Sequence, residues 1–146
     1  MNNVLLTGAT GFVGCELSAE LVRNKVNVLA AVREYSSDLP AEVRQQVVGD
    51  LLPVSNWSLV LQGVDKIIHL AARVHIMNDS VADPLPEFRK VNVDGTLNLA
   101  RQAAEAGVIR FIFISSIKVN GEMTNEGFPF RPDDNINVTD PYGLSK

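Results

Sequence analysis

Short apolar runs separated by turn residues recur along the chain and predict the strands of a buried sheet. These runs occupy residues 3–7, 26–32, 46–48, 66–70 and 110–114, the last of which reads Arg-Phe-Ile-Phe-Ile. Short, branched apolar runs bounded by turn residues are typical of strands that are covered on both faces. We therefore predict five buried strands.

Helical spacing of apolar side chains appears between these runs. Residues 12–24 carry Val13, Leu17 and Leu21 on one helical face. We predict a brief helix at residues 56–62 and a long one at 84–106, which Gly107 would end. Residues 118–139 predict a long loop, and Asp140-Pro141 then reads as an N-cap followed by proline in the first turn. This alternation predicts an α/β fold, a doubly wound parallel sheet with helices on both faces.

Composition narrows the class of protein. The length of 146 residues fits one domain, and the formal charge of −4 without a basic stripe argues against nucleic acid as a partner. The first residues lack the pattern of a signal peptide, and no apolar run reaches membrane-spanning length. A single cysteine, Cys15, excludes an internal disulfide framework. We therefore expect a cytoplasmic protein with no membrane partner.

A glycine motif joins the first predicted strand to the first predicted helix. Gly8, Gly11 and Gly14 follow the spacing G-x-x-G-x-x-G. Glycines at such a turn let backbone approach a pyrophosphate, while the helix start offers free N–H groups. A tight turn without a ligand is the plainer alternative, but the position between strand and helix favours dinucleotide binding.

The end of the second strand bears on the choice of nucleotide. An acidic residue there would hold the ribose hydroxyls of NAD, but this strand ends on Arg33, whose guanidinium suits the 2′-phosphate of NADP. We therefore slightly favour NADP over NAD. An exposed arginine paired with Glu34, or Glu34 itself serving the ribose, is the alternative. Asp50, followed by Leu51, is either a contact to the adenine or a turn aspartate.

Polar side chains after the fifth strand and near the end of the chain predict where the reaction takes place. Tyr142 and Lys146 are four residues apart and share a face if they lie on a helix. An ammonium beside a phenol favours the phenolate, which can exchange a proton with a substrate hydroxyl or carbonyl. Ser115 and Ser116 end the fifth strand, where one hydroxyl can polarise the same oxygen and the other can cap the strand.

Taken together, these motifs resemble the extended short-chain dehydrogenase/reductase family. The resemblance is to its NAD-dependent epimerase/dehydratase branch, which contains nucleotide-sugar epimerases such as UDP-glucose 4-epimerase, dehydratases and 4-reductases. The matching segments are Thr7-Gly-Ala-Thr-Gly-Phe-Val-Gly14, Gly49-Asp50-Leu51, His69-Leu-Ala-Ala72, Asn92-Val-Asp-Gly-Thr96, Phe113-Ile-Ser-Ser116 and Pro141-Tyr-Gly-Leu-Ser-Lys146. They come in family order across nearly the whole chain, which implies a Rossmann-type fold.

The resemblance also implies a role for each matching position. The catalytic residues would be Ser116, Tyr142 and Lys146, and the last two would also contact the cofactor. The other cofactor contacts would be Gly8, Gly11, Phe12, Val13, Gly14, Asp50, Leu51, Leu70, Ala71, Ala72 and Asn92. The epimerases of the family oxidise C4 of a UDP-hexose, rotate the keto sugar and reduce its other face. A UDP-linked sugar is therefore the expected substrate.

Some positions depart from the family pattern. Lys118 stands where epimerases have a small polar residue near the sugar. Arg33 replaces the acidic residue common in NAD-retaining epimerases, and this change favours an NADP-dependent 4-keto-sugar reductase as the alternative. Arg73 and His75 follow the fourth strand and are candidate substrate contacts. His69 and His75 lack the ligand cluster that a metal site needs, so no metal is expected.

The resemblance further implies that family members extend beyond this chain. We expect residues 1–146 to be an incomplete NAD(P)-binding domain, truncated after the fifth strand and lacking the carboxyl-terminal substrate domain. Such a fragment should fold and bind cofactor but show little turnover. The sequence is also compatible with a non-catalytic nucleotide-binding module and with an enzyme that acts on a steroid or flavonoid ketone. The helix at 84–106 is a candidate homodimer surface.

Overall fold

The computed structural model describes residues 2–74, 83–136 and 138–146. Within these residues five strands form one parallel sheet in the order β3-β2-β1-β4-β5. The strands are β1 (Asn3–Thr7), β2 (Asn27–Val32), β3 (Arg44–Val47), β4 (Lys66–His69) and β5 (Arg110–Phe113). The chain moves outward from β1 to β3, then returns to the other side of β1 with β4. This order places a topological switch point between β1 and β4, where ligands of such sheets bind.

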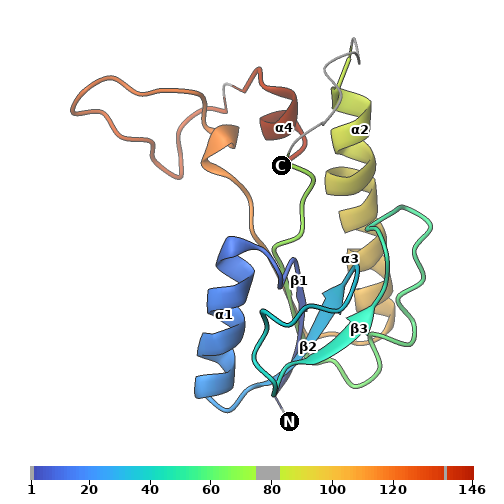
Figure 1. Cartoon of the computed structure of the whole chain (residues 1–146). Coiled ribbons are helices and arrows are strands. Elements are labelled where there is room, and N and C mark those ends of the chain that lie inside the picture. Colours follow the sequence, from blue (N-terminus) through green and yellow to red (C-terminus); the bar gives the residue numbers. More distant parts are fainter. Residues whose placement is uncertain (1, 75–82, 137) are drawn as a thin grey trace.

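Helices cover both faces of the sheet, as the sequence predicts (Figure 1). On one face lies α1 (Phe12–Arg23). On the other lies a continuous rod made of α2 (Leu85–Arg89), the π-helix η1 (Lys90–Gly95) and α3 (Thr96–Glu105). The 3₁₀-helix η2 (Ile117–Val119) and the short α4 (Pro141–Leu144) follow β5. The fold is therefore the predicted Rossmann-type α/β fold.

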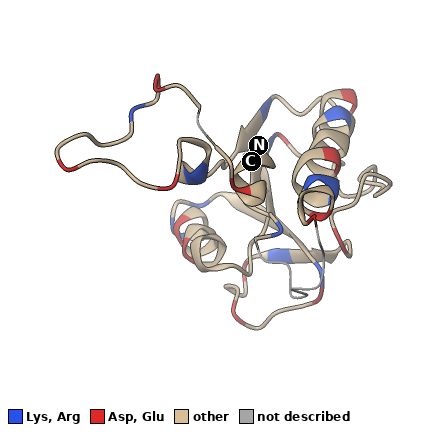
Figure 2. Cartoon of the chain, turned by 90° about the horizontal axis from the view of Figure 1, so that it is seen from above, with Lys and Arg blue, Asp and Glu red and all other residues tan. Residues whose placement is uncertain are grey.

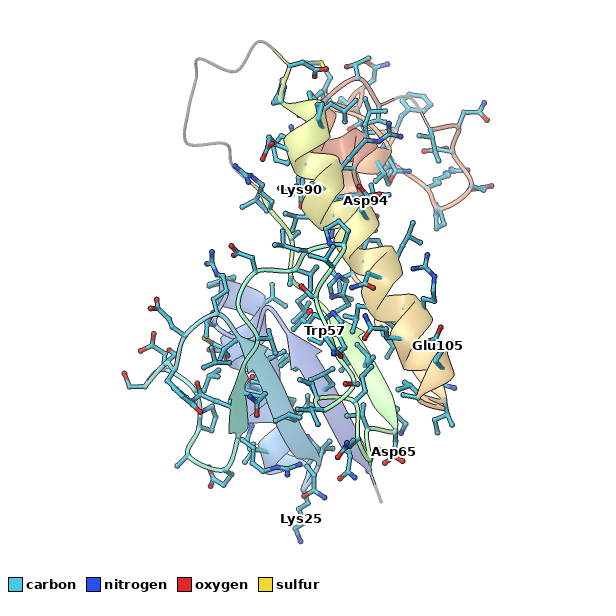
Figure 3. The ribbon with its side chains drawn as sticks, turned by 90° about the vertical axis from the view of Figure 1, so that its right-hand side faces the viewer. Lys25, Trp57, Asp65, Lys90, Asp94 and Glu105 are labelled. Carbon is cyan, nitrogen blue, oxygen red and sulfur yellow. The ribbon has the colours of Figure 1, made fainter. Side chains whose placement is uncertain are left out.

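Each face of the sheet has its own apolar core, because neighbouring side chains of a strand point to opposite faces. Leu5 of β1 packs with Trp57, Ile67 and Leu99 on the side of the rod, whereas Leu6 packs in the cluster against α1. Figure 3 shows Trp57, which is 1% exposed, between the strands and the rod.

The prediction of a helix at residues 56–62 is wrong. The segment is a series of turns, although one helical bond runs from Leu61 N to Trp57 O over 2.9 Å. The Gln102 side chain accepts a bond from Trp57 N at 2.8 Å and donates one to Ser55 O at 2.9 Å. These bonds hold the chain at Ser55 and Trp57 against α3, and the segment that follows continues as turns.

Two smaller differences concern boundaries. The third strand begins at Arg44, two residues before the predicted start, because Arg44 already pairs with Leu29 of β2. The long helix is confirmed, but its middle widens into the π-helix. There Gly95 lies so close to the Leu51 backbone that a Cβ would sit 2.7 Å from the Leu51 carbonyl oxygen.

Charged side chains are mixed over the surface and do not gather on one face (Figure 2). Among the described residues, no helix is both long and apolar enough to cross a membrane.

Candidate functional site

The turn between β1 and α1 depends on two close backbone approaches. Gly8 has φ +71°, a conformation that side chains with a Cβ rarely adopt. A Cβ on Gly8 would lie 2.7 Å from the Ala71 nitrogen, and one on Gly14 would overlap the Gly8 carbonyl oxygen. The turn therefore excludes side chains at both positions. As a result, the end of β1, the start of α1 and the loop after β4 pack directly against one another.

The start of α1 offers open hydrogen-bond donors. Gly11 is the N-cap and supplies no side-chain cap, and the first helical bond runs from Cys15 N to Gly11 O at 2.9 Å. The N–H groups of Phe12, Val13 and Gly14 thus have no intrahelical acceptor. Phe12 and Val13 are 92% and 58% exposed, whereas Gly14 is buried, so the exposed part of this helix start is at Phe12 and Val13. A cradle of this shape, with aligned N–H groups, fits the pyrophosphate of a dinucleotide.

The loop after β4 forms the second wall. Leu70 N donates to Thr7 O at 3.2 Å, and Ala71 N donates to the Thr7 hydroxyl at 3.3 Å. These bonds place Leu70 and Ala71 beside the glycine turn.

His69 sits beneath this wall as a buried neutral group. Its Nδ1 lies 2.6 Å from Thr7 Oγ1 and its Nε2 lies 2.9 Å from Thr96 Oγ1. The ring packs beside Phe111 and Phe113. Burial, assisted by the Lys146 charge, lowers the pKa of His69 from 6.5 to about 4. The histidine is therefore neutral near pH 7 and ties β1, β4 and α3 together.

A cavity of about 150 Å³ lies where the sequence predicts the adenine ribose. It is lined by Thr10 of the glycine turn and by Arg33, Glu34, Tyr35 and Ser36 after β2. No ion pair within the described residues involves Arg33, so the predicted alternative of a pair with Glu34 is not formed. Asp50 is exposed in the loop after β3, and Leu51 lies against Gly95.

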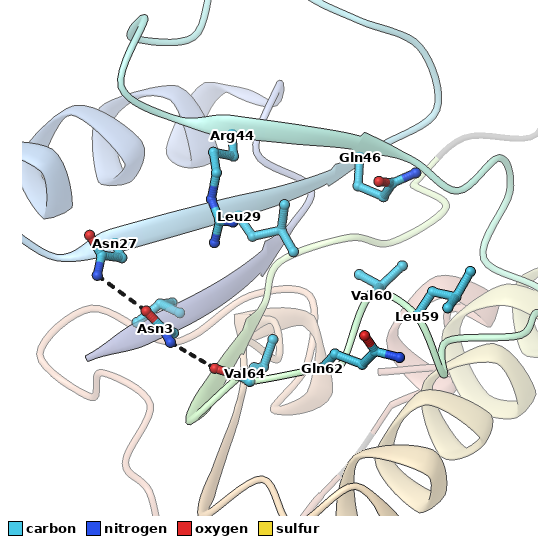
Figure 4. A pocket seen from close by; sticks show the side chains of 11 residues that line it. Asn3, Asn27, Leu29, Arg44, Gln46, Leu59, Val60, Gln62 and Val64 are labelled. Carbon is cyan, nitrogen blue, oxygen red and sulfur yellow. Dashed lines mark hydrogen bonds between the residues drawn. The ribbon is translucent and has the colours of Figure 1, made fainter. Parts of the chain in front are cut away.

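A larger cavity of about 380 Å³ lies at the amino ends of the strands (Figure 4). It is bordered by Asn3, Asn27 and Arg44, and none of the predicted site residues lines it. We place the site at the smaller cavity, because ligands of parallel α/β sheets bind beyond the carboxyl ends of the strands.

The tyrosine helix α4 begins as the sequence predicts. Asp140 is the N-cap, and its carboxylate accepts a bond from Gly143 N at 2.7 Å, with Pro141 in the first turn. Tyr142 contacts the Phe88 ring edge on at a centroid distance of 5.9 Å. A Cβ on Gly143 would lie 2.8 Å from the Lys118 carbonyl oxygen, so α4 packs closely between η2 and α2.

The predicted catalytic residues lie in one region but are not bonded to one another. The Ser116 hydroxyl caps η2 by accepting from Lys118 N at 3.2 Å. Lys146 places its Nζ 4.5 Å from the centroid of the Phe113 ring, and burial lowers its pKa. Within the described residues, no hydrogen bond joins the Tyr142 hydroxyl to Ser116 or Lys146. Ser115 meets the same end of the chain by donating to Lys146 O at 3.3 Å.

Asn92 is buried in the π-helix, with its amide engaged by protein groups. Its Oδ1 accepts from Arg73 N at 2.8 Å, and its Nδ2 donates to Arg73 O at 3.0 Å and to Ser145 Oγ at 2.8 Å. The side chain therefore joins the loop after β4 to the end of α4, rather than presenting a free amide to a cofactor.

Two of the three candidate substrate contacts, Arg73 and Lys118, each have an acidic partner. Arg73 Nη1 lies 3.4 Å from a Glu87 carboxylate oxygen. The Lys118 ammonium donates to both Glu122 oxygens at 2.8 Å, and this bond raises the pKa of Lys118. The third candidate, His75, lies outside the described residues. Within them, no cluster of three or more His, Cys, Asp or Glu side chains suited to a metal ion occurs.

Sequence reasoning missed two groups that shape the site. Ser145 is 4% exposed and bonds to Asn92, and Thr96 bonds to His69. Both lie inside segments that carry the family resemblance. A polar residue next to a candidate catalytic residue is the signal that would have indicated Ser145.

Comparisons with known proteins agree with this geometry. The NAD dependent epimerase/dehydratase family matches residues 4–146. A UDP-glucose 4-epimerase of Vibrio cholerae is 46% identical over 145 residues, covering 99% of this chain and 44% of that protein. A 3-beta-hydroxysteroid dehydrogenase of Mycolicibacterium neoaurum is 35% identical over 124 residues, covering 82% of this chain and 33% of that protein.

A solved structure of MoeE5 in complex with UDP-glucuronic acid and NAD is similar in fold. The TM-score is 0.79 at 31% identity, covering 98% of this chain and 45% of that one. The chain thus spans less than half the length of these relatives.

Proposed function

The chain belongs to the NAD-dependent epimerase/dehydratase family, and we propose that it is the cofactor-binding part of a nucleotide-sugar epimerase. In this proposal the reaction takes place at C4 of a UDP-linked hexose, and a substrate-binding part lies outside residues 1–146. The Vibrio cholerae relative, a UDP-glucose 4-epimerase, supports the substrate class.

The observation that carries the proposal is the glycine cradle. Two positions exclude a Cβ, and the helix start leaves the N–H groups of Phe12, Val13 and the buried Gly14 without an intrahelical acceptor. These groups would hold the pyrophosphate, because a helix start attracts negative charge. The walls made by Leu70 and Ala71 would then face the nicotinamide half.

We assign proton transfer to the side chains around α4. When bound, the nicotinamide cofactor would supply hydride transfer to and from the sugar carbon. Tyr142 takes the hydroxyl proton as phenolate and gives it back when the keto group is reduced. Ser116 donates a hydrogen bond to the same oxygen, and the Lys146 ammonium favours the phenolate and holds the ribose.

One observation favours a second candidate, an NADP-dependent 4-keto-sugar reductase. Arg33 is exposed beside the cavity at the glycine turn and belongs to no ion pair among the described residues. A free guanidinium there suits a 2′-phosphate. We therefore propose NADP as the slightly preferred cofactor, with Glu34 and the ribose hydroxyls of NAD as the alternative.

Calorimetric titration of the chain with NADPH and with NADH tests the cofactor assignment. We expect tighter binding of NADPH, a preference lost in Arg33→Ala and kept in Arg44→Ala, which alters an arginine at the other cavity. Preference for NADH in the unaltered chain contradicts the role of Arg33 and favours the epimerase. Binding of neither cofactor contradicts the proposed function of this chain.

Two further parts of the proposal have their own measurements. We expect no steady conversion of UDP-glucose by this chain alone, and measurable turnover would show that no further segment is needed. Pairing of two copies through the rod, where Leu97 is 55% exposed, predicts a dimer in sedimentation. A monomer at micromolar concentration would contradict that pairing.

A further inference from the structure

Ser145 is the C-cap of α4, directly before the predicted catalytic residue Lys146, and has no role in the chemistry described so far. The residue is 4% exposed, and its hydroxyl donates to Tyr142 O at 2.7 Å. The Ser145 hydroxyl oxygen also accepts from Asn92 Nδ2 at 2.8 Å, across 53 residues of sequence. A buried side chain bonded on both sides in this way fixes two elements relative to each other.

Asn92 extends this link to the wall of the cofactor cradle. Its amide makes two bonds to the Arg73 backbone, which continues directly from Leu70, Ala71 and Ala72. The loop after β4, the π-helix and the end of α4 therefore meet at one buried carboxamide. A change at Ser145 releases α4 from this junction without touching the glycine turn.

The tyrosine helix α4 needs bonds to other elements in order to be stable. A helix of four residues has too few internal bonds to be stable alone. Asp140 caps its start, Tyr142 contacts Phe88 edge on, and Gly143 packs against the Lys118 carbonyl. At its end Ser145 bonds to Asn92, and the next residue, Lys146, accepts a bond from Ser115 and lies over the Phe113 ring.

We propose that Ser145 is a positioning residue, which acts through Asn92 to hold Tyr142 and Lys146 in register with the loop after β4. The inference rests on the proposed function, because it assigns this register to the nicotinamide half of the site. It predicts that loss of the bond between Ser145 and Asn92 weakens binding of the nicotinamide half of the cofactor but not of the ADP half.

Calorimetric titrations with ADP and with NADH separate these halves, because NADH adds only a nicotinamide riboside to ADP. We expect the unaltered chain to bind NADH more tightly than ADP. Ser145→Ala should weaken NADH binding about tenfold, the scale of one buried hydrogen bond, and leave ADP binding within about twofold. Asn92→Ala removes the same bond from the other side and serves as an independent variant. The double variant should bind NADH no more weakly than Asn92→Ala alone.

Asn98→Ala is the matched control. Asn98 is also a buried amide of the rod, and its Nδ2 donates to Leu52 O and Ser55 O, away from α4. Its loss should lower the melting temperature but leave the ratio of NADH to ADP affinity unchanged.

The outcomes distinguish this inference from the proposed function. Equal weakening of both ligands in Ser145→Ala, or no change in either, overturns the positioning role. An unaltered chain that binds ADP and NADH equally also overturns it, while the assignment of the glycine turn stands. A chain that binds neither ligand overturns the proposed function, and this inference with it.

Discussion

The two ends of the candidate site are held in place by different kinds of contact. At the glycine end, backbone packs on backbone: Gly8 lies against Ala71, and Gly14 lies against the Gly8 carbonyl. At the tyrosine end, side chains hold a four-residue helix through the Asp140 cap, the Phe88 contact and the bond between Ser145 and Asn92. The glycine end thus rests on backbone approaches, whereas the tyrosine end combines one such approach, of Gly143 to the Lys118 carbonyl, with individual side-chain contacts.

This difference has a consequence for how each end responds to change. A cradle made of backbone lies within the cooperative unit of the sheet, so damage there destabilises the whole domain. A short helix held by a few side chains can open locally while the sheet stays folded. Mutations at the two ends should therefore separate global from local stability.

The largest effect is expected from Gly8→Ala. A Cβ there meets Ala71 backbone and also forces a positive φ. The backbone conformation alone costs about 1–2 kcal/mol, and the overlap adds about 1–3 kcal/mol. Urea denaturation should show the sum as a loss of unfolding free energy.

Gly63→Ala is the control for that experiment. Gly63 has nearly the same φ, +70°, but no atom within 4 Å of the added Cβ. It should therefore show only the conformational cost. Equal losses in the two variants would contradict the close approach at the glycine turn.

The next effect concerns pH and the buried His69. Its pKa is about 4 in the folded state and 6.5 in the unfolded state. The unfolded state takes up the proton first, so the stability it contributes is complete above about pH 6.5 and is lost as the pH falls toward 4. The shift corresponds to about 3 kcal/mol. Urea denaturation between pH 7 and pH 4 should show this loss for the whole domain.

Lys146 links this histidine to the tyrosine end. Its charge is the second cause of the low pKa, after burial. Lys146→Met should therefore raise the His69 pKa, as measured by NMR of the imidazole protons. An unchanged pKa would show that the two residues lie farther apart than in this structure.

A smaller and local effect is expected at the cap of α4. Asp140→Ala removes the bond to Gly143 N and should cost about 1 kcal/mol. Hydrogen exchange should accelerate at Leu144, Ser145 and Lys146 and remain unchanged in β1 and β4. Faster exchange throughout the sheet would contradict the local character of this end.

The smallest effect is expected from Lys118→Met. The ammonium of Lys118 pairs with Glu122 at the surface, and such pairs contribute little in water. Any difference in melting temperature from the unaltered chain should disappear at high salt. A difference that persists in salt would indicate that Lys118 has a role besides this pair.

The difference between local backbone patterns and contacts with distant side chains also explains which features the sequence predicts. The strands, α1 and the glycine turn are local patterns, so the sequence predicts β1 at its observed residues and the other strands within about two. The place of Asp140 before proline likewise identifies it as a cap. These features depend on residues near one another in the chain.

The features that sequence reasoning missed depend on distant partners. The side chain of Gln102, 45 residues away, bonds to Trp57 N near the start of residues 56–62, where the prediction of a helix is wrong. Ser145 is bonded to Asn92, and Asn92 in turn is bonded to the Arg73 backbone. No local pattern encodes these bonds, because their partners lie on other elements.

The most direct test of the central claim is an NMR titration of the backbone amides with ADP. The account predicts that the amide signals of Phe12, Val13 and Gly14 shift most, because these N–H groups at the helix start would hold the pyrophosphate, while α4 stays unchanged. Addition of NADH should then shift the signals of Leu70, Ala71 and α4 as well. If ADP leaves the signals of Phe12, Val13 and Gly14 in place, or shifts only residues of the larger cavity, the glycine turn is not the cofactor site.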